Sequence, residues 1–166
     1  GVGWIHLRFP VCAARASWGA PALGWHIDGA TARLDTQQSV VVLPLVTPIR
    51  RGGGGTALLR GSHKTIARWV HDRGADGVDR QSAGIDTLQE HIDRFVLPAA
   101  LARAGAAAVE EVSGNAGDVL LMHPLLVHAS SVAHRHTFEL DGAGWQAVPH
   151  GIRVTFNLSI GWVSPP

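Results

Sequence analysis

Residues 24–29 contain a histidine and an aspartate, His26 and Asp28, separated by a single residue. Successive side chains of an extended strand alternate between its two faces, so these two would project from the same face. An imidazole nitrogen and a carboxylate oxygen placed in this way can occupy adjacent positions on a divalent metal ion. A second histidine from elsewhere would complete a set of two histidines and one carboxylate, which is typical of non-haem Fe(II) oxygenases.

A downstream histidine, His128, is the candidate for the third donor. Gly117 and Asp118 indicate a turn, and the apolar run that follows them predicts a buried strand that ends at His128. Histidine is the most common metal ligand, yet a single histidine with apolar neighbours is more often structural. The ordered set of three residues is therefore a more specific signal than any of its members.

Length and composition predict one compact domain. With 166 residues, of which 46% are hydrophobic and 16% charged, the chain is long enough to bury about 70% of its unfolded surface. A net charge of +1 leaves no basic excess that would attract nucleic acid or an anionic membrane. No apolar run approaches the ~18 residues that span a bilayer. The single cysteine, Cys12, provides no partner for an intrachain disulfide and favours a cytoplasmic location.

Hydrophobic patterning predicts mainly strands. Residues 4–9, 39–49 and 56–59 are typical of strands, and residues 151–162 alternate apolar and polar side chains, as in a strand with one wall against the core. Residues from about 64 to 104 instead carry apolar residues at helical spacing, which predicts a helical insertion. This insertion is either a cover over one sheet edge or a lid over an active site.

The glycine run at residues 52–55 predicts a turn between strands. It lacks the order of a phosphate-binding loop, because Lys64 follows His63 rather than a glycine. Many short strands joined by glycine-rich turns are typical of a sandwich or a barrel.

Two segments in the first half of the chain carry a distinctive combination of motifs. Residues 24–28 contain the H-x-D pair, and residues 54–64 read GGTALLRGSHK. Together they resemble the phytanoyl-CoA dioxygenase family of Fe(II)/2-oxoglutarate oxygenases, in which an H-x-D strand is followed by a GGT…PGSHK segment. Arg60 stands where the family usually has proline, a difference that affects a turn more than the chemistry.

The second half of the chain continues the resemblance, which spans residues 24 to about 160. Residues 128–130 resemble the distal H-x-S motif of the family. Arg153 opens the last core strand, where the family carries the arginine that binds its co-substrate. His128 and Arg153 are 25 residues apart (153 − 128), which is longer than expected for the family, so Arg135 is an alternative for this role.

The resemblance implies a mainly β fold, a double-stranded β-helix (jelly roll, cupin-like) with the helical insertion between its core strands, as a single domain over residues 1–166. Family members usually carry additional N-terminal helices, and a chain that begins without Met is compatible with a fragment. The resemblance further implies that the metal ligands of Fe(II) are His26, Asp28 and His128, and that His123, His134 and His136 are not ligands.

The implied reaction is a hydroxylation of a small organic substrate by O2, with conversion of 2-oxoglutarate to succinate and CO2. Arg153 and Ser130 would bind the distal carboxylate of 2-oxoglutarate, since arginine can donate two parallel charge-assisted hydrogen bonds. The alternative for Arg153 is a solvated charge at a sheet edge. Related oxygenases that halogenate replace the carboxylate ligand by Gly or Ala, so Asp28 favours hydroxylation.

The substrate is not encoded in any motif. Candidates for pocket walls, which are equally candidates for the core, are Trp4, His6, Trp18, Trp25 and Leu34. Two other classes of function stay open. A cupin-like metalloenzyme that does not use 2-oxoglutarate would have no carboxylate for Arg153 and Ser130 to bind, and a non-catalytic jelly-roll binding module would bind no metal.

Overall fold

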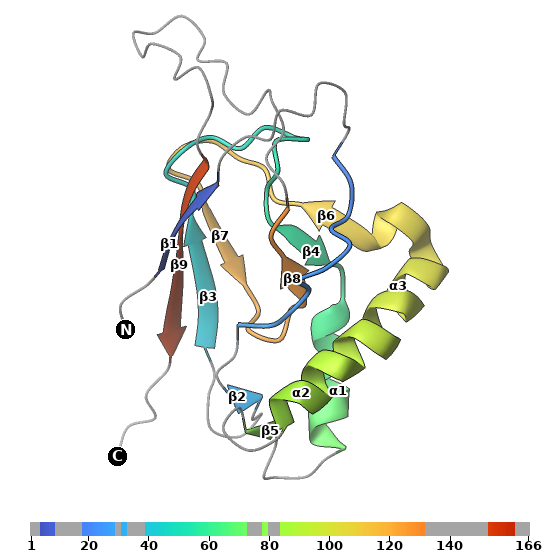
Figure 1. The fold of residues 1–166 in the computed structure, drawn as a ribbon. Coiled ribbons are helices and arrows are strands. Elements are labelled where there is room, and N and C mark those ends of the chain that lie inside the picture. Colours follow the sequence, from blue (N-terminus) through green and yellow to red (C-terminus); the bar gives the residue numbers. More distant parts are fainter. Residues whose placement is uncertain are drawn as a thin grey trace, which may run out of the picture.

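The computed structural model describes residues 4–8, 18–28, 31–32, 39–72, 78–79, 84–131 and 153–161. Its strands form a four-stranded sheet, a three-stranded sheet and a two-stranded ribbon, all antiparallel. In Figure 1 the two larger sheets lie in separate layers, and the helices lie beside the three-stranded one.

The four-stranded sheet contains the first and the last strand of the fold. In spatial order its strands are β1 (Trp4–Arg8), β9 (Arg153–Gly161), β3 (Ser39–Pro44) and β7 (Val119–Met122). The register of β1 on β9 runs from the pair Trp4 and Asn157 to the pair Arg8 and Arg153. Directly opposed residues project from the same face of a sheet, so this register decides which side chains of β1 and β9 share a face.

The three-stranded sheet is shorter. Its strands, in spatial order, are β6 (Val109–Glu111), β4 (Ala57–Leu59) and β8 (His128–Ala129). His26 extends this sheet beyond β8 through one antiparallel bridge to His128. The separate ribbon pairs β2 (Thr31–Ala32) with β5 (Val78–Asp79).

Helices fill most of the chain between β4 and β6. They are α1 (Ser62–His71), α2 (Gly84–His91), the π-helical turn η1 (Ile92–Val96), α3 (Leu97–Ala104) and the 3₁₀ turn η2 (Gly105–Ala108). Ile66 and Val70, which lie four residues apart on α1, are both buried, as expected for one apolar face of a helix. None of the described helices is long and apolar enough to cross a membrane.

The helices pack on the outer face of the three-stranded sheet. Their buried residues Ile66, Val70 and Ile92 share one core cluster with the odd-numbered residues of β4, β8 and the His26 segment. Those sheet residues are Trp25, Ile27, Ala57, Leu59, Val127 and Ala129. Because side chains alternate along a strand, the even-numbered residues face the other way. The described helices of this segment thus cover the outer face and do not lie over the His26 face.

A second apolar cluster fills part of the space between the two sheets. Val41, Leu43 and Met122 of the four-stranded sheet are buried in it, and Leu58 of β4 packs against them. Leu58 lies directly opposite His128 in the register of β4 on β8. His128 and its bridge partner His26 therefore face the interior between the two sheets.

Two details of the expected strands are wrong. The apolar run before His128 is not one buried strand: β7 ends at Met122, a turn follows in which the Leu126 amide donates to the His123 carbonyl (2.9 Å), and β8 begins in the other sheet. Val119 and Leu121 are exposed. A proline inside the run explains the break, because Pro124 supplies no amide hydrogen to a ladder. The strand expected over residues 39–49 likewise ends early, at Pro44.

The prediction of a mainly β fold is confirmed by these sheets. The jelly-roll connectivity stays a prediction.

Candidate metal centre

His26 and His128 lie directly opposite each other across an antiparallel bridge. The amide of each donates to the carbonyl of the other, both at 2.9 Å. Their imidazole rings project from the same face, with centroids 4.5 Å apart and planes inclined by 50°. The backbone of the sheet therefore sets the spacing of the two rings.

The carboxylate of Asp28 completes the group. Asp28 Oδ1 lies 3.5 Å from His26 Nε2 and 3.4 Å from His128 Nε2. One ligand atom from each residue can be chosen such that all three lie within 4.8 Å of one another. Neighbouring donors on a six-coordinate ion with bonds of ~2.1 Å are ~3 Å apart, so small side-chain movements would bring these atoms to a divalent cation. The donor set fits the metal that the sequence implies.

Backbone carbonyls orient both imidazoles. Nδ1 of His26 lies 2.7 Å from the Gly24 carbonyl oxygen, and Nδ1 of His128 lies 2.9 Å from the Leu126 carbonyl oxygen. A carbonyl oxygen can only accept, so each Nδ1 carries a proton, and each Nε2 is the nitrogen that can bind a metal. Such a hydrogen bond on the second ring nitrogen is typical of metal-binding histidines.

Asp28 is held from the opposite sheet. The side-chain amide of Asn157, on β9, donates to Asp28 Oδ2 at 2.7 Å, which leaves Oδ1 facing the two imidazoles. Burial acts to raise the pKa of Asp28, but hydrogen bonds from His128, His26 and Asn157 outweigh it and hold the pKa well below its usual range. The carboxylate is thus ionised and ready to bind a cation.

The group is open on one side. The side chain of His26 is 44% exposed, whereas those of Asp28 and His128 are 17% and 7% exposed. A ligand would therefore reach the three donors from the His26 side.

Polar side chains of β9 line the interior near this centre. Arg153 and Thr155 are buried at 2% and 3% exposure, and Asn157 continues the same face at the next alternate position. The polar face of β9 is thus the buried one near the site, while Ile160 on the other face is exposed. Sequence reasoning missed Asn157, although the polar alternation of residues 153–159 contained the signal.

Arg153 is a buried residue, so the alternative of a solvated edge charge is wrong. Its Nη1 donates to the carbonyl of Gly54, and its Nε has no hydrogen-bond partner among the residues that the structure describes. Burial, and after it the charge of Arg8, lowers the pKa of Arg153 to about 10. A buried guanidinium of this kind is suited to an anionic ligand.

The glycine turn before β4 is held by an internal carboxylate. Glu111 accepts hydrogen bonds from the amides of Gly54 (2.8 Å), Gly55 (2.9 Å) and Gly52. The amides that would bind a phosphate are therefore already occupied, in agreement with the sequence-based exclusion of a phosphate loop. The turn instead presents the Gly54 carbonyl to Arg153.

A comparison with known protein families shows to which family this chain belongs. The model of the family described as phytanoyl-CoA dioxygenase (PhyH) matches residues 4–134. The chain belongs to the phytanoyl-CoA dioxygenase family. A search of curated proteins found no match. The family is in general dependent on Fe(II) and 2-oxoglutarate.

The match to the phytanoyl-CoA dioxygenase family includes His26, Asp28, His128 and Ser130 and ends before Arg153. Ser130 is exposed and accepts a hydrogen bond from Arg8 Nη2 at 2.6 Å. Sequence reasoning did not single out Arg8, which comes from the opposite end of the chain.

The next residue, Ser131, has a structural role. It is buried, donates to the Gly55 carbonyl and accepts from Trp18 Nε1 at 3.1 Å. Trp18 is therefore anchored against the glycine turn.

The remaining expected wall residues separate into several groups. Trp25 belongs to the core at 1% exposure, and Trp4 is 77% exposed. His6 is half-buried and opposes Thr155, on the face of Arg153 and Asn157. Leu34 lies outside the described residues.

Other histidines stand apart from the centre. His123 lies against His63, with ring centroids 5.1 Å apart, and it is not part of the group of three donors that the described residues form. His134, His136 and the alternative arginine, Arg135, lie outside the described residues.

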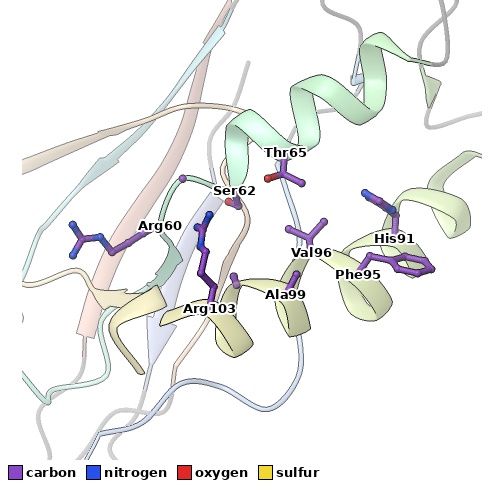
Figure 2. A pocket seen from close by; sticks show the side chains of 10 residues that line it. Arg60, Ser62, Thr65, His91, Phe95, Val96, Ala99 and Arg103 are labelled. Atoms are coloured by element: carbon purple, nitrogen blue, oxygen red, sulfur yellow. The ribbon is translucent and has the colours of Figure 1, made fainter. Parts of the chain in front are cut away.

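A separate pocket of about 230 Å³ lies between α1 and the segment from α2 to α3 (Figure 2). Figure 2 shows Phe95, Val96 and Ala99 on one wall and Ser62 and Thr65 on the other, with Arg60 and Arg103 nearby. The helices that form this pocket cover the outer face of the three-stranded sheet, so it does not open onto the metal-ligand face.

Proposed function

We propose that this chain is an Fe(II)- and 2-oxoglutarate-dependent oxygenase that hydroxylates a small organic substrate. The observation that carries the proposal is the convergence of His26, Asp28 and His128 at one point in a chain of the phytanoyl-CoA dioxygenase family. The reaction would convert 2-oxoglutarate, O2 and a substrate C–H bond into succinate, CO2 and a C–OH product. One oxygen atom would enter succinate and the other the product.

The proposed architecture is a double-stranded β-helix. Consecutive strands cross between the two larger sheets, from β3 to β4 and from β7 to β8. The candidate ligands face the interior between these sheets, which is where such a fold would hold its metal. A cytoplasmic location is also part of the proposal, because the single cysteine of the sequence is compatible with a reducing compartment.

His26, Asp28 and His128 would hold Fe(II) through Nε2, Oδ1 and Nε2. A structural zinc site would use four protein donors, whereas three donors leave half of a six-coordinate ion open to small molecules. When bound, Fe(II) supplies the one-electron chemistry through which O2 reacts. The role of Asp28 is to contribute a negative charge and to occupy the position that the related halogenating enzymes leave open.

Arg153 would bind the distal carboxylate of 2-oxoglutarate. Asn157, which touches Asp28, and Arg153 are four residues apart on β9, or ~13 Å at ~3.3 Å per residue. A five-carbon diacid held at the metal by one end covers about half of this distance, and the long arginine side chain can cover the remainder. The burial of Arg153 favours this co-substrate over a cupin-like reaction without it, because a buried cation needs an anionic partner.

Succinate release tests the proposal directly. Protein loaded with Fe(II) without oxygen would be mixed with 2-oxoglutarate, air and a panel of small organic substrates, and succinate would be measured beside the hydroxylated product. We expect succinate release that a true substrate increases, and its loss in Asp28→Ala. A wild-type protein that binds Fe(II) but consumes no 2-oxoglutarate would contradict the proposal.

A further inference from the structure

Arg8 and Arg153 lie directly opposite each other at the end of the β1–β9 ladder. Opposed residues of an antiparallel pair share a face, so the two guanidinium groups extend from the same side of the sheet. That side is the one that carries Asn157, the partner of Asp28. Two arginines from the two ends of the chain therefore meet on the metal side of the four-stranded sheet.

Both arginines have unused hydrogen-bonding capacity. Within the described residues, Nε of Arg8 and Nε of Arg153 are buried and have no hydrogen-bond partner. Nη2 of Arg8 donates to Ser130 Oγ at 2.6 Å, and Nη1 of Arg153 donates to the Gly54 carbonyl. Each of these contacts fixes one side of a guanidinium and leaves further donors for a ligand.

The charges of the two arginines are not balanced within the described part of the chain. There, no carboxylate lies within ion-pair distance of either guanidinium. Glu111 is the carboxylate that acts on Arg153 electrostatically, but its oxygens accept the backbone amides of the glycine turn. Two adjacent cations, of which Arg153 is buried and Arg8 half-buried, repel each other unless an anion lies between them.

We propose that Arg8 is a second co-substrate-binding residue, and that Arg8 and Arg153 together form a clamp for one carboxylate group. The clamp rests on the proposed function, because the carboxylate would be the distal one of 2-oxoglutarate. Ser130 orients Arg8 by accepting its Nη2 hydrogen, and its own hydroxyl hydrogen is then available to the carboxylate. Ser130 would thus contact both Arg8, from which it accepts a hydrogen bond, and the carboxylate, to which it donates one.

The clamp predicts opposite effects of one substitution on two measurements. In ligand-free protein, Arg8→Gln removes the repulsion of Arg153, so the melting temperature should rise or stay unchanged. The same variant should bind a dicarboxylate at least about tenfold more weakly, since a charge-assisted pair is lost. A residue with only a structural role would lower the melting temperature and leave dicarboxylate affinity unchanged.

The experiment compares wild type, Arg8→Gln, Arg8→Lys and the control Arg103→Gln, which alters an arginine of the separate helical pocket. Melting temperatures and dissociation constants would be measured with glutarate in metal-free protein, and with 2-oxoglutarate in protein loaded with Fe(II) without oxygen. Glutarate has the distal carboxylate but no 2-oxo group with which to chelate a metal. We expect Arg8→Gln to weaken both ligands, Arg8→Lys to do so less, and the control to match wild type.

The two ligands separate the clamp from the proposed function. If glutarate binding depends on Arg8 but Fe(II) does not strengthen the binding of 2-oxoglutarate, the result would support the clamp and contradict the proposed function. If 2-oxoglutarate binding depends on Fe(II) and Arg8→Gln leaves it unchanged, the result would support the proposed function and contradict the clamp. Failure of wild type to bind either ligand would overturn both.

Discussion

Asn157 and Asp28 join the two sheets at the candidate metal centre: the amide nitrogen of Asn157 lies 2.7 Å from Asp28 Oδ2. Asn157 belongs to the four-stranded sheet, whereas Asp28 follows the bridge that extends the three-stranded one. This hydrogen bond fixes which carboxylate oxygen faces His26 and His128. The geometry of the centre therefore depends on the packing of one sheet against the other.

We expect Asn157→Ala to weaken Fe(II) binding by about 10- to 100-fold. Removing the hydrogen-bond partner of a metal-binding side chain typically lowers metal affinity by this factor. Calorimetric titration with Fe(II) in the absence of oxygen would measure the change. Asn115→Ala, at an exposed turn, is the matched control and should bind as wild type does. Equal affinities for the two variants would show that Asn157 does not position Asp28.

His128→Ala should abolish Fe(II) binding, since two donors remain where three are needed. His123→Ala should not, because His123 lies against His63 and outside the group of three donors. Metal content after anaerobic loading and desalting distinguishes the two variants. The opposite pattern would remove His128 from the proposed ligands.

Arg153→Ala should raise the dissociation constant of 2-oxoglutarate by about a hundredfold or more. Removing one partner of a buried ion pair costs about 3 to 5 kcal/mol, and ~1.4 kcal/mol corresponds to a factor of ten. Titration of the Fe(II)-loaded protein would measure the constant, and Fe(II) affinity should change little. Arg135→Ala serves as the comparison and should bind 2-oxoglutarate nearly as wild type does; if it is the damaging change, the role belongs to Arg135.

Gly55→Ala should lower the free energy of unfolding by about 2 to 3 kcal/mol, in the range of other forced overpacking. A Cβ atom at Gly55 would overlap the backbone carbonyl of Val112, so β4 and β6 would have to separate locally. Gly19→Ala is the matched control, since nothing lies within 4 Å of a Cβ atom there. Urea unfolding of both variants gives the comparison. Equal free energies of unfolding would show that the glycine turn accommodates a Cβ atom at Gly55 without loss of stability.

His123→Asn should make stability less sensitive to mild acid. Burial, and after it the charge of His63, lowers the pKa of His123 from 6.5. The unfolded chain therefore binds a proton more readily than the folded chain, and the wild type loses stability as the pH falls below about 6.5. Asn can still accept the Leu125 amide hydrogen that His123 Nδ1 accepts. Unfolding free energies at about pH 8 and about pH 5.5 measure the effect; an equal decrease in the two proteins would contradict it.

The grouping of His26 with Asp28 could be predicted from the sequence because it depends on local information. His26 and Asp28 share a face by strand alternation alone, and the structure brings His128 to them. The alternation of β9 also placed Arg153 and Asn157 on one face, but it could not tell which face is buried. That choice depends on the opposite sheet, because Asp28 supplies the partner that keeps Asn157 inside.

The contribution of Arg8 could not be predicted in the same way. Arg8 and Arg153 are almost the whole chain apart, and their relation depends on the register of β1 on β9. A shift of that register by one residue would turn Arg8 to the other face. The break between β7 and β8 was also hidden, because an apolar run is equally compatible with one strand or with two strands in different sheets.

The reciprocal backbone pair between His26 and His128 has a consequence for metal selectivity. Sheet hydrogen bonds fix the two backbones, and carbonyl oxygens orient the two imidazoles, before any ion arrives. Different divalent ions would therefore meet nearly the same donors. Affinity for a nitrogen and oxygen site of this kind rises from Fe²⁺ through Co²⁺ and Ni²⁺ to Cu²⁺. A rigid centre would thus favour the wrong ions on affinity alone, and the supply of free ions in the cell would decide whether iron occupies it.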